Sequence, residues 1–400
     1  MSKTEQFIHE VEEVSAHNYH PLPVVIAEAS GIWVTDVEGK RYVDMLSAYS
    51  AVNQGHRHPR IIKALKDQAD RLTLTSRAFH NDQMGPFCRK LTKLTGYDKA
   101  LLMNTGAEAV ETAIKAARRW GYNVKKVPEG KAKIICCDGN FHGRTTTIVG
   151  FSTDPDCRTG FGPFTPGFEI IPYNDAAALE KAIDANTVAF LVEPIQGEAG
   201  VFVPSEGYLK RCREITKKHN VLMICDEIQT GFGRTGRMFC SDWESVRPDI
   251  ITMGKALGGG VYPVSGIVAD DEVMMAAFEP GNHGSTFGGN PLACAVASTA
   301  LDVIVDENLP ARSAELGDYF RGEIRKAAIP RIKEIRGRGL LTGVELNEKA
   351  RPFSEELMRR GILAKDTHGT TIRFAPPLVI TKDELAEAVK TIVAVLGRQA

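Results

Sequence analysis

The sequence lacks a charge excess, a long apolar run and a cysteine pattern, and each absence excludes a class of protein. Its 400 residues carry 49 Lys and Arg against 50 Asp and Glu, without dense basic runs. That balance argues against a partner such as nucleic acid or an anionic membrane surface. No apolar stretch approaches the roughly 18 residues that cross a bilayer. The polar first 20 residues lack the apolar region of a secretion signal.

The eight cysteines form no CxxC pair and show no metal-ligand spacing, so we expect neither a disulfide framework nor a metal site. Cys136, Cys137 and Cys225 lie in apolar runs, where free thiols act as small hydrophobic groups. This usage is typical of the reducing cytoplasm. A GxGxxG turn between a strand and a helix and a P-loop are also missing, which argues against a dinucleotide or nucleoside triphosphate site.

Short apolar runs alternate with amphipathic stretches through the middle of the chain. Five runs are apolar almost throughout, as strands covered on both faces are, and they span 133–138, 188–194, 221–227, 249–254 and 263–269. Helical patterns lie between and around them, over 59–72, 83–95, 106–121, 205–219 and 288–306. The alternation predicts an α/β fold with a mainly parallel sheet.

After about residue 305 the pattern changes to longer helices and strand pairs, which indicates a separate α+β unit. Near the other end, strand-forming residues flank Glu38 and Gly39 and predict a hairpin. Because chain ends often lie close together, we expect this hairpin to join the C-terminal unit. We therefore predict an N-terminal segment that contributes to a small domain, a large ligand-binding domain and a C-terminal small domain, over 1–45, 46–305 and 306–400.

A carboxylate stands where the buried run 221–227 ends. Asp226 is placed at the C-terminal end of a strand, where open α/β sheets bind ligands. A carboxylate there costs several kcal/mol unless a cation or hydrogen-bond donors meet it, so we expect a positively charged ligand atom. Capping of the next turn is the alternative. Gln229 lies three residues further on, within reach of the same ligand.

Lys255 follows another apolar run and stands among glycines. Lysine forms imines with carbonyl groups when desolvation lowers its pKa and small neighbours leave room for a planar partner. An ordinary solvated lysine is the alternative. Nine of the 37 glycines lie in the 36 residues from Gly254 to Gly289. Glycine permits a close approach of backbone to a flat ligand, so this segment is predicted to form one wall of the site.

The segment 103–120 begins a strongly helical run with a capping box formed by Thr105 and Glu108. Gly106 and Ala107 leave the helix N-terminus bare, and its N–H groups and positive dipole end can hold a phosphate. Capping boxes are common, so a purely structural role is the alternative.

A second glycine-rich segment, 281–291, offers the hydroxyls of Ser285 and Thr286 and is also suited to phosphate. The expected ligand therefore has a phosphate, a carbonyl for Lys255 and a positive nitrogen for Asp226. Pyridoxal phosphate has all three.

These motifs resemble the class III, or ω-amino acid, aminotransferases of the fold-type I pyridoxal phosphate superfamily. DEIQTGFGRTG, the lysine in GKALGGG and GSTFGGNPL are highly specific together, and the resemblance covers nearly the whole chain. It implies a large domain whose mainly parallel seven-stranded sheet lies between helices, plus a small α+β domain built from both chain ends. It also implies a homodimer with its active site at the subunit interface.

The resemblance assigns roles around pyridoxal phosphate. Lys255 is expected to form the imine and to carry the proton of the 1,3-shift, while Asp226 keeps the pyridinium nitrogen protonated. The other expected cofactor contacts are Gln229 near the phenolic oxygen, Phe141 and Ile228 on the two ring faces, Gly106, Ala107 and Ser285 near the phosphate, and Thr286 at the phosphate of the neighbouring subunit. Phe141 taken alone also fits a core position. For His142 we expect packing or a hydrogen bond to a cofactor-binding residue.

Within the family, HNYHPLPVV, VEGKRYVDMLSAYSAVNQGHRHP and FHGRT resemble members that act on ornithine. The resemblance implies a ping-pong transfer of the δ-amino group of ornithine to 2-oxoglutarate, giving glutamate 5-semialdehyde and glutamate. The expected substrate residues are Arg373 for the α-carboxylate of glutamate and 2-oxoglutarate, Glu198 to neutralise Arg373 when ornithine binds, Arg144 and Tyr19 for the far end of ornithine, and Tyr49 as a pocket wall.

Three alternatives remain at this point. Arg144 can instead hold a phosphate or pair with Glu193. The substrate can be acetylornithine or 4-aminobutyrate, because members acting on these would share Lys255, Asp226 and the Glu198–Arg373 pair. A non-catalytic α/β protein that kept the fold for binding is the more distant possibility.

Overall fold

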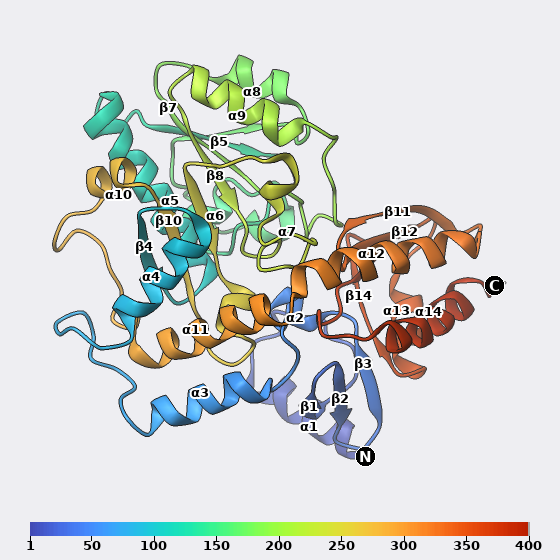
Figure 1. Ribbon diagram of the computed structural model, residues 1–400. Coiled ribbons are helices and arrows are strands. Elements are labelled where there is room, and N and C mark those ends of the chain that lie inside the picture. Colours follow the sequence, from blue (N-terminus) through green and yellow to red (C-terminus); the bar gives the residue numbers. More distant parts are fainter. Residues whose placement is uncertain (399–400) are drawn as a thin grey trace.

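The centre of the computed structural model, which describes residues 1–398, is a seven-stranded sheet (Figure 1). Strand β10 is antiparallel to both of its neighbours, and the other adjacent strands are parallel to one another. In spatial order the strands of this large sheet are β4 (Lys99–Met103), β10 (Ser265–Ala269), β9 (Ile250–Met253), β8 (Leu222–Asp226), β7 (Thr187–Val192), β5 (Lys133–Cys137) and β6 (Phe168–Ile171). The prediction of a mainly parallel seven-stranded sheet is confirmed.

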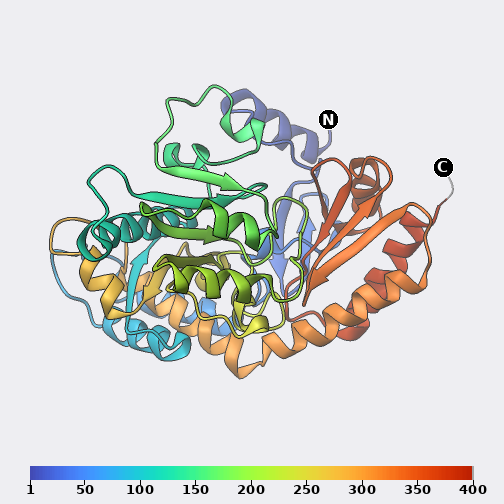
Figure 2. The ribbon, with the colours of Figure 1, turned by 90° about the horizontal axis from the view of Figure 1, so that it is seen from above.

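Helices cover both faces of the large sheet, and Figure 2 shows the resulting layers. Because side chains alternate along a strand, Leu222 and Ile224 of β8 pack towards one face and Met223 and Cys225 towards the other. The first face is covered by α5 (Gly106–Trp120), α6 (Thr146–Val149) and α10 (Asp271–Ala277). The second face is covered by α3 (Pro59–Ala69), α4 (Met84–Thr95), α8 (Ala176–Ala182), α9 (Tyr208–Lys218) and α11 (Pro291–Asp306).

Two four-stranded sheets lie beside the large sheet. The N-terminal sheet has the order β1 (Ile26–Ser30), β2 (Trp33–Asp36), β3 (Arg41–Asp44) and β13 (Ile362–Leu363). Strand β13 pairs in parallel with β3, so the hairpin formed by β2 and β3 joins the C-terminal part of the chain. The C-terminal sheet has the order β11 (Ile332–Arg338), β12 (Leu341–Leu346), β15 (Thr371–Phe374) and β14 (Lys365–Thr367).

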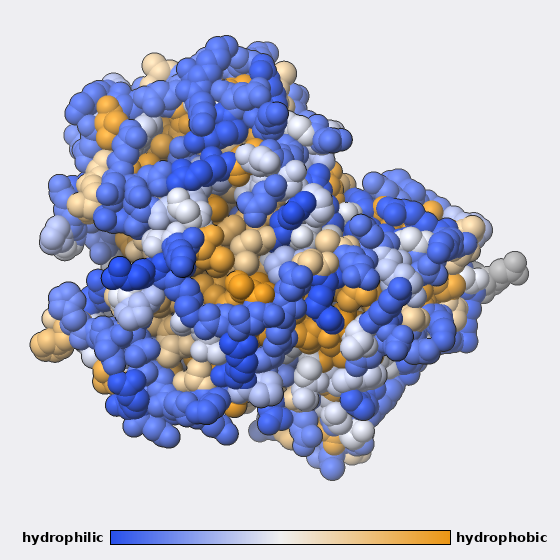
Figure 3. All heavy atoms as spheres, in the orientation of Figure 1, coloured by the Kyte–Doolittle hydropathy of each residue, from blue (hydrophilic) through white to orange (hydrophobic). Residues whose placement is uncertain are grey.

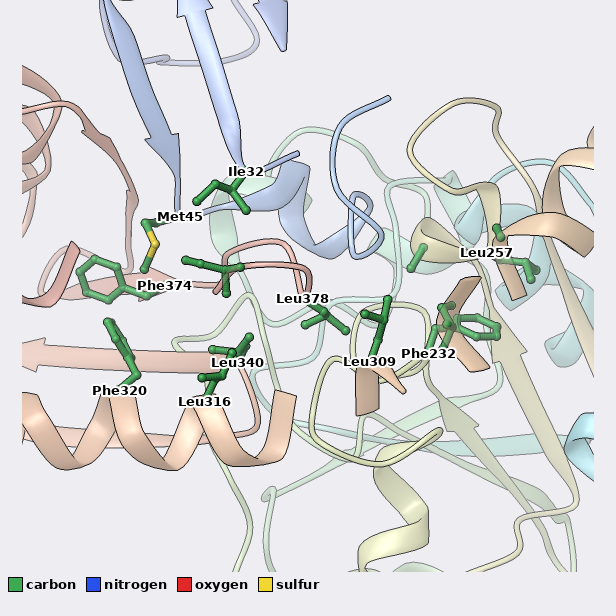
Figure 4. Packing of buried hydrophobic residues seen from close by; sticks show 14 of the residues in the cluster. Ile32, Met45, Phe232, Leu257, Leu309, Leu316, Phe320, Leu340, Phe374 and Leu378 are labelled. Atoms are coloured by element: carbon green, nitrogen blue, oxygen red, sulfur yellow. The ribbon is translucent and has the colours of Figure 1, made fainter. Parts of the chain in front are cut away.

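A continuous apolar core joins the sheets. Figure 4 shows Phe320 and Phe374 facing Met45 at one end, and Leu309 beside Phe232 at the other. Removing a large buried side chain of this kind costs about 3–5 kcal/mol, so the core holds the sheets in a fixed relation. The C-terminal helices that enclose this core are α12 (Leu309–Lys326), α13 (Arg351–Arg359) and α14 (Lys382–Leu396).

Several elements were not predicted. The edge strands β4 and β6 are only partly buried, and α1 (Lys3–Val14) has no buried residue, so none of these three elements gives a strong burial pattern. Short turns complete the chain, namely α2 (Ser47–Ser50), α7 (Pro155–Arg158), a π-turn over Gly121–Lys125 and two 3₁₀ turns over Cys240–Glu244 and Lys255–Gly258. Within residues 1–398, every helix is too short or too polar to cross a membrane.

Candidate active site

Two adjacent parallel strands bring Asp226 and Lys255 to the same edge of the large sheet. Asp226 is the last residue of β8, and Lys255 follows β9 after a single glycine. Thr252 of β9 is the register partner of Asp226, and its hydroxyl donates to Asp226 Oδ1 at 3.0 Å. The backbone N–H of Ile228 donates to the same oxygen at 3.1 Å. One carboxylate oxygen is therefore held by the fold itself.

The second oxygen of Asp226 is bound by His142. His142 Nδ1 lies 2.7 Å from Asp226 Oδ2, and the imidazole is only 1% exposed. Burial alone would lower the pKa of His142, but the hydrogen bond and charge of Asp226 raise it overall. His142 Nε2 is buried and has no hydrogen-bond partner within the described residues. His142 therefore makes the expected hydrogen bond to a residue predicted to bind the cofactor, namely Asp226.

Lys255 stands at a sharp change of backbone direction. Gly254 has an extended φ of −176°, and Lys255 itself lies in the left-handed region with φ 44°. Such positions cost about 1–3 kcal/mol and cluster at functional sites. The side chain is half-buried. Burial lowers the pKa of the amine, although the nearby carboxylates of Glu198 and Asp226 oppose this. The setting favours the neutral amine that nucleophilic chemistry requires.

The N-terminus of α5 has two free donors. The Thr105 side chain accepts from the N–H of Glu108, and the Glu108 carboxylate accepts from the N–H groups of Asn104 and Thr105. This capping box uses the other end groups and leaves the N–H groups of Gly106 and Ala107 without an intrahelical partner. Both are directed beyond the helix end, where an anion is favoured.

Two glycines at this edge of the sheet lie so close to their neighbours that a side chain would not fit without a shift. A Cβ on Gly106 would lie 3.1 Å from Ile228 Cδ1, and one on Gly143 would lie 3.0 Å from Ala107 Cβ. One pocket collects the predicted residues Gly106, Ala107, Phe141, Asp226, Ile228, Gln229 and Lys255. Its donor set of an amine, a carboxylate and a bare helix N-terminus fits pyridoxal phosphate. We call Gly106, Ala107, Asp226, Ile228 and Lys255 the sheet-edge cluster.

Glu193 also lines this pocket, although the sequence indicates it only as an alternative partner of Arg144. Its Oε2 accepts from the backbone N–H of Phe141 at 2.9 Å. Burial raises the pKa of Glu193 to about 8, which the charge of His142 only partly offsets. The shift favours the neutral carboxylic acid at this position. Among residues 1–398 Arg144 and Glu193 form no ion pair, and Arg144 is exposed whereas Glu193 is buried. The Arg144 guanidinium carbon lies 5.6 Å from the Phe141 ring centre.

A buried ion pair stands beside the pocket. Arg373 of β15 is 2% exposed, and its Nη1 donates to Glu198 Oε1 at 2.8 Å. Burial would raise the pKa of Glu198, but the charges of Arg373 and Lys255, together with the hydrogen bonds from Arg373 and Gln229, outweigh it and lower that pKa to about 2. Gln229 Nε2 donates to the same Glu198 oxygen at 3.0 Å. Gln229, which was predicted to lie near the phenolic oxygen of the cofactor, therefore binds the Glu198 carboxylate in this structure.

Two tyrosines complete this side of the site. The Tyr49 ring centre lies 4.7 Å from the guanidinium carbon of Arg373. Burial raises the pKa of Tyr49, and the nearby Tyr19 adds to the shift, while Arg373 opposes it. Tyr19 is 70% exposed. We call Tyr19, Tyr49, Arg144, Glu198 and Arg373 the mouth cluster.

The segment carrying Tyr19 is tied to the C-terminal part of the chain by contacts that the sequence did not reveal. Lys365 Nζ donates to the carbonyl of His20 at 3.1 Å, and Arg351 Nη2 donates to that of Pro21 at 2.9 Å. Neither contact has a local motif, because the partners lie more than 300 residues apart in the chain.

Ser285 and Thr286 are neighbours in the sequence but have different surroundings. The hydroxyl of Ser285 accepts from Asn104 Nδ2 at 2.8 Å, next to the start of α5. Thr286 is exposed and does not line the pocket that contains Lys255. The structure therefore brings Ser285 towards the helix end of its own chain and leaves Thr286 facing outward.

A mainly parallel α/β sheet with a desolvated lysine, a paired aspartate and a bare helix N-terminus at one edge defines a cofactor-dependent enzyme of the pyridoxal phosphate type. The family described as Aminotransferase class-III matches residues 14–396. The chain therefore belongs to the class-III aminotransferases.

Similar proteins fall in the same family. The chain is 63% identical over 396 residues to an ornithine aminotransferase of Brevibacillus brevis, covering 99% of each chain. It is 50% identical, with a TM-score of 0.97, to an ornithine aminotransferase structure of Toxoplasma gondii that has pyridoxal phosphate at partial occupancy in its active site, covering 98% of this chain and 94% of that one. An acetylornithine aminotransferase structure of Elizabethkingia anophelis is 51% identical with a TM-score of 0.90, covering 99% of both chains.

Proposed function

We propose that this chain transfers the δ-amino group of L-ornithine to 2-oxoglutarate, giving glutamate 5-semialdehyde, which closes to pyrroline-5-carboxylate, and L-glutamate. The Glu198–Arg373 pair at 2.8 Å supports the use of two different substrates, and the 63% identity to an ornithine aminotransferase supports ornithine as the donor. One substrate presents a carboxylate beside its reacting carbon and the other does not. A site serving both needs an arginine whose charge is available for the first and neutralised for the second.

Pyridoxal phosphate is the cofactor of this reaction, and it is held by the sheet-edge cluster. Asp226 receives the ring nitrogen, Ile228 and Phe141 enclose the ring, and the N–H groups of Gly106 and Ala107 bind the phosphate. When bound, the cofactor supplies a carbonyl carbon that takes up amino groups and a ring that withdraws electrons. The fixed hydrogen bonds from Thr252 and His142 keep the Asp226 carboxylate in place for this contact.

Lys255 moves the proton. With pyridoxal phosphate bound, the Lys255 Nζ would take a proton from the δ-carbon of ornithine and pass it on towards the cofactor. Burial lowers the pKa of the amine and so favours the neutral form, which a base must have at the start of the step. Water then releases the aldehyde product. The second half-reaction uses the same Nζ in reverse, with 2-oxoglutarate as the acceptor.

The mouth cluster distinguishes the two substrates. Arg144 and Tyr19 hold the far end of ornithine, with the guanidinium on its α-carboxylate, and Tyr49 limits the pocket. Glu198 stays on Arg373 during this half-reaction, so that no buried charge is left unpaired. For glutamate and 2-oxoglutarate, Glu198 moves away and the Arg373 fork binds the α-carboxylate.

The deciding experiment compares ornithine, N-acetylornithine and 4-aminobutyrate as donors with 2-oxoglutarate as acceptor. Purified protein should be yellow and lose that colour on addition of ornithine in the absence of an acceptor. Ornithine should have the largest kcat/KM. A clear preference for either other donor would overturn the substrate assignment, and a colourless protein that cannot be reconstituted would overturn the enzyme assignment.

Acetylornithine is the second candidate because a 51% identical structure belongs to an acetylornithine aminotransferase. The two donors differ at the α-nitrogen, which is a charged amine in ornithine and a neutral amide in N-acetylornithine. Tyr19 and Tyr49 are the residues that distinguish them in this proposal. Tyr49→Phe and Tyr19→Phe should therefore change the ratio of kcat/KM for the two donors, while leaving the glutamate half-reaction unchanged.

We further propose a cytoplasmic homodimer in which Thr286 reaches the phosphate bound by the other subunit. Thr286 faces outward beside Phe287, which is 47% exposed, and Phe79 is also exposed. Figure 3 shows apolar side chains gathered in a hollow at the middle of one face, within a mostly hydrophilic surface. Exposed apolar patches of this kind mark interaction sites.

Mixed dimers test this arrangement. A heterodimer of a Lys255→Ala chain and a Thr286→Ala chain should contain one intact site and one doubly defective site. Its activity should exceed that of either variant homodimer. Activity no higher than the mean of the two homodimers would contradict a contribution across the interface.

A further inference from the structure

The segment that carries Tyr49 has an unusual backbone. Four consecutive residues of α2, Ser47, Ala48, Tyr49 and Ser50, have φ values of 51°, 47°, 60° and 71°. Residues other than glycine avoid this left-handed region because Cβ approaches the following carbonyl oxygen. Single positions of this kind are uncommon, and a run of four without a glycine persists only where the surroundings hold it.

The entry to this left-handed turn is held by Asp44. Its Oδ1 accepts from the backbone N–H groups of Leu46 and Ser47, both at 2.8 Å. Its Oδ2 lies 2.7 Å from His56 Nε2, which fixes the carboxylate from the other side. The turn therefore starts from a buried acidic anchor.

Two hydrogen bonds also connect the turn to the segment that follows Arg373 of β15. The hydroxyl of Ser47 donates to the carbonyl of Ala375 at 2.6 Å, and the N–H of Ala375 donates to the carbonyl of Met45 at 2.7 Å. Ala375 lies two residues beyond Arg373. Within the described residues, the Ser47 hydroxyl is the one side-chain group of the turn that makes a hydrogen bond, because the buried Ser50 Oγ has no partner.

These hydrogen bonds have different consequences for Arg373 and for Tyr49. Arg373 is held independently of the turn, since its backbone pairs with Gly343 of β12 on one side and Lys365 of β14 on the other. Tyr49 has no strand partner, and its ring reaches the Arg373 guanidinium at 4.7 Å only while the turn stays left-handed. Loosening the turn therefore displaces Tyr49 and leaves Arg373 in place.

We propose that Ser47 is a positioning residue for ornithine specificity, which holds the left-handed turn so that Tyr49 forms the wall of the ornithine pocket. The proposal rests on the proposed function, because it takes Tyr49 to contact ornithine and not glutamate. Asp44 and the Ala375 backbone are the anchors between which the turn is fixed.

The test compares Ser47→Ala with its matched control Ser50→Ala in the full-length holoenzyme. Both changes remove one buried hydroxyl from the same turn, but only the first removes a hydrogen bond. Loss of one buried hydrogen bond corresponds to roughly a tenfold change in an equilibrium, so Ser47→Ala should raise the KM for ornithine about tenfold. The half-reaction with glutamate should stay within about twofold, and Ser50→Ala should leave both substrates unchanged.

A rescue distinguishes positioning from general damage. Glycine adopts the left-handed region freely, so Ala48→Gly in the Ser47→Ala background should bring the KM for ornithine back towards the wild-type value. Hydrogen exchange at the Ala51 N–H, which donates to the Ser47 carbonyl at 2.8 Å, should be faster in Ser47→Ala and slower again in the double variant.

Three results would overturn the proposal: equal losses with ornithine and glutamate, a Ser50→Ala defect as large as that of Ser47→Ala, or no recovery in the double variant. Wild-type turnover of ornithine is measured in the same series. If the wild type prefers another donor, the proposed function fails, whereas normal wild-type turnover with an unselective Ser47→Ala defect defeats the positioning role alone.

Discussion

The sheet-edge cluster and the mouth cluster are built from different kinds of structure. Asp226 ends β8, Lys255 follows the adjacent β9 after one glycine, and Gly106 and Ala107 begin α5 shortly after β4 of the same sheet. Glu198 and Arg373 come from different parts of the chain and meet across the junction between the large sheet and the C-terminal sheet. The first cluster is rigid because the sheet is rigid. The second depends on turns and on contacts between distant segments.

This difference matches a difference in chemical demand. Both half-reactions use the same proton transfer, so the residues that perform it need not change between substrates. The two substrates differ in whether a carboxylate is attached to the reacting carbon and in what lies at the far end, and the proposed function assigns both differences to the mouth cluster. We therefore expect changes in the sheet-edge cluster to affect both half-reactions equally and changes in the mouth cluster to affect them unequally.

The largest effect should follow from Lys255→Ala. Removal of the group that we propose to move the proton should lower both half-reactions by at least about 10⁴-fold, as expected for loss of a general base that is also a nucleophile. Single-turnover absorbance changes with ornithine and with glutamate measure the two half-reactions separately. Lys90→Ala, which removes a surface lysine paired with Asp302, is the control and should behave as wild type. If Lys255→Ala slowed the half-reaction with only one of the two substrates, the proposed division of roles between the two clusters would be wrong.

Asp226→Ala should have the next largest effect. Loss of the charge facing the ring nitrogen should lower both half-reactions by about 10²–10³-fold, the magnitude typical of a single electrostatic group in a closed site. The variant should also bind pyridoxal phosphate less tightly, as measured by cofactor release on dialysis. Asp226→Glu keeps the charge and should recover part of the activity. Unchanged activity with full cofactor retention would remove Asp226 from the cofactor site.

Glu198→Ala should separate the two half-reactions. Without Glu198, Arg373 becomes an unpaired buried charge whenever ornithine is bound, which costs about 2–5 kcal/mol in comparable cases. We expect the ornithine half-reaction to fall by about 10–100-fold and the glutamate half-reaction to change by less than about threefold, because glutamate supplies its own carboxylate.

Stopped-flow measurement of both half-reactions checks the Glu198 prediction. Glu206→Ala removes an acidic side chain that lies outside the pocket containing Lys255 and serves as the control. Equal losses with ornithine and glutamate would show that Glu198 is structural and that the mouth cluster does not switch.

The sequence could indicate Gly106, Ala107, Asp226 and Lys255 as candidate site residues because the signals they give are local, and the structure places all four around one pocket. The apolar run that ends at Asp226, the glycines around Lys255 and the Thr105–Glu108 capping box each combine a residue type with a neighbouring element. Parallel strands bring their carboxyl ends to one edge, so the meeting of these residues follows from the fold class. The edge strands and α1 were missed, although Ser2 and Glu5 form a capping box that marks the start of α1.

The mouth cluster could be predicted only through the resemblance to a family. Tyr19 and Tyr49 are ordinary tyrosines in the sequence, and nothing near Ser47 indicates four left-handed residues. The contacts that hold them join residues more than 300 positions apart, such as Ser47 with Ala375. No periodicity or spacing rule encodes such a pair, because its geometry depends on how the sheets pack. The assigned roles in both clusters remain predictions that the experiments above test.

Substitution of Glu193 should have the smallest effect on activity, because Glu193 lines the pocket of the sheet-edge cluster but has no proposed contact with either substrate. Burial raises its pKa to about 8, well above the ordinary value of a glutamate. Between these two pKa values the folded protein holds a proton that the unfolded chain has released. The resulting stability is fully present below the unfolded pKa and is lost as pH rises through about 8.

Glu193→Gln imitates the neutral form at every pH, and its amide oxygen can still accept from the Phe141 N–H. At pH 7 both half-reactions should therefore stay within about twofold of wild type. Thermal unfolding between pH 5 and 8.5 should show the wild type losing stability relative to the variant as pH rises. Glu193→Ala leaves the Phe141 N–H without its acceptor and should be less stable than Glu193→Gln at all pH values. Parallel stability curves for wild type and Glu193→Gln would mean that the carboxyl group is already ionised in the folded protein, and the sheet edge would then contain a second buried anion beside Asp226.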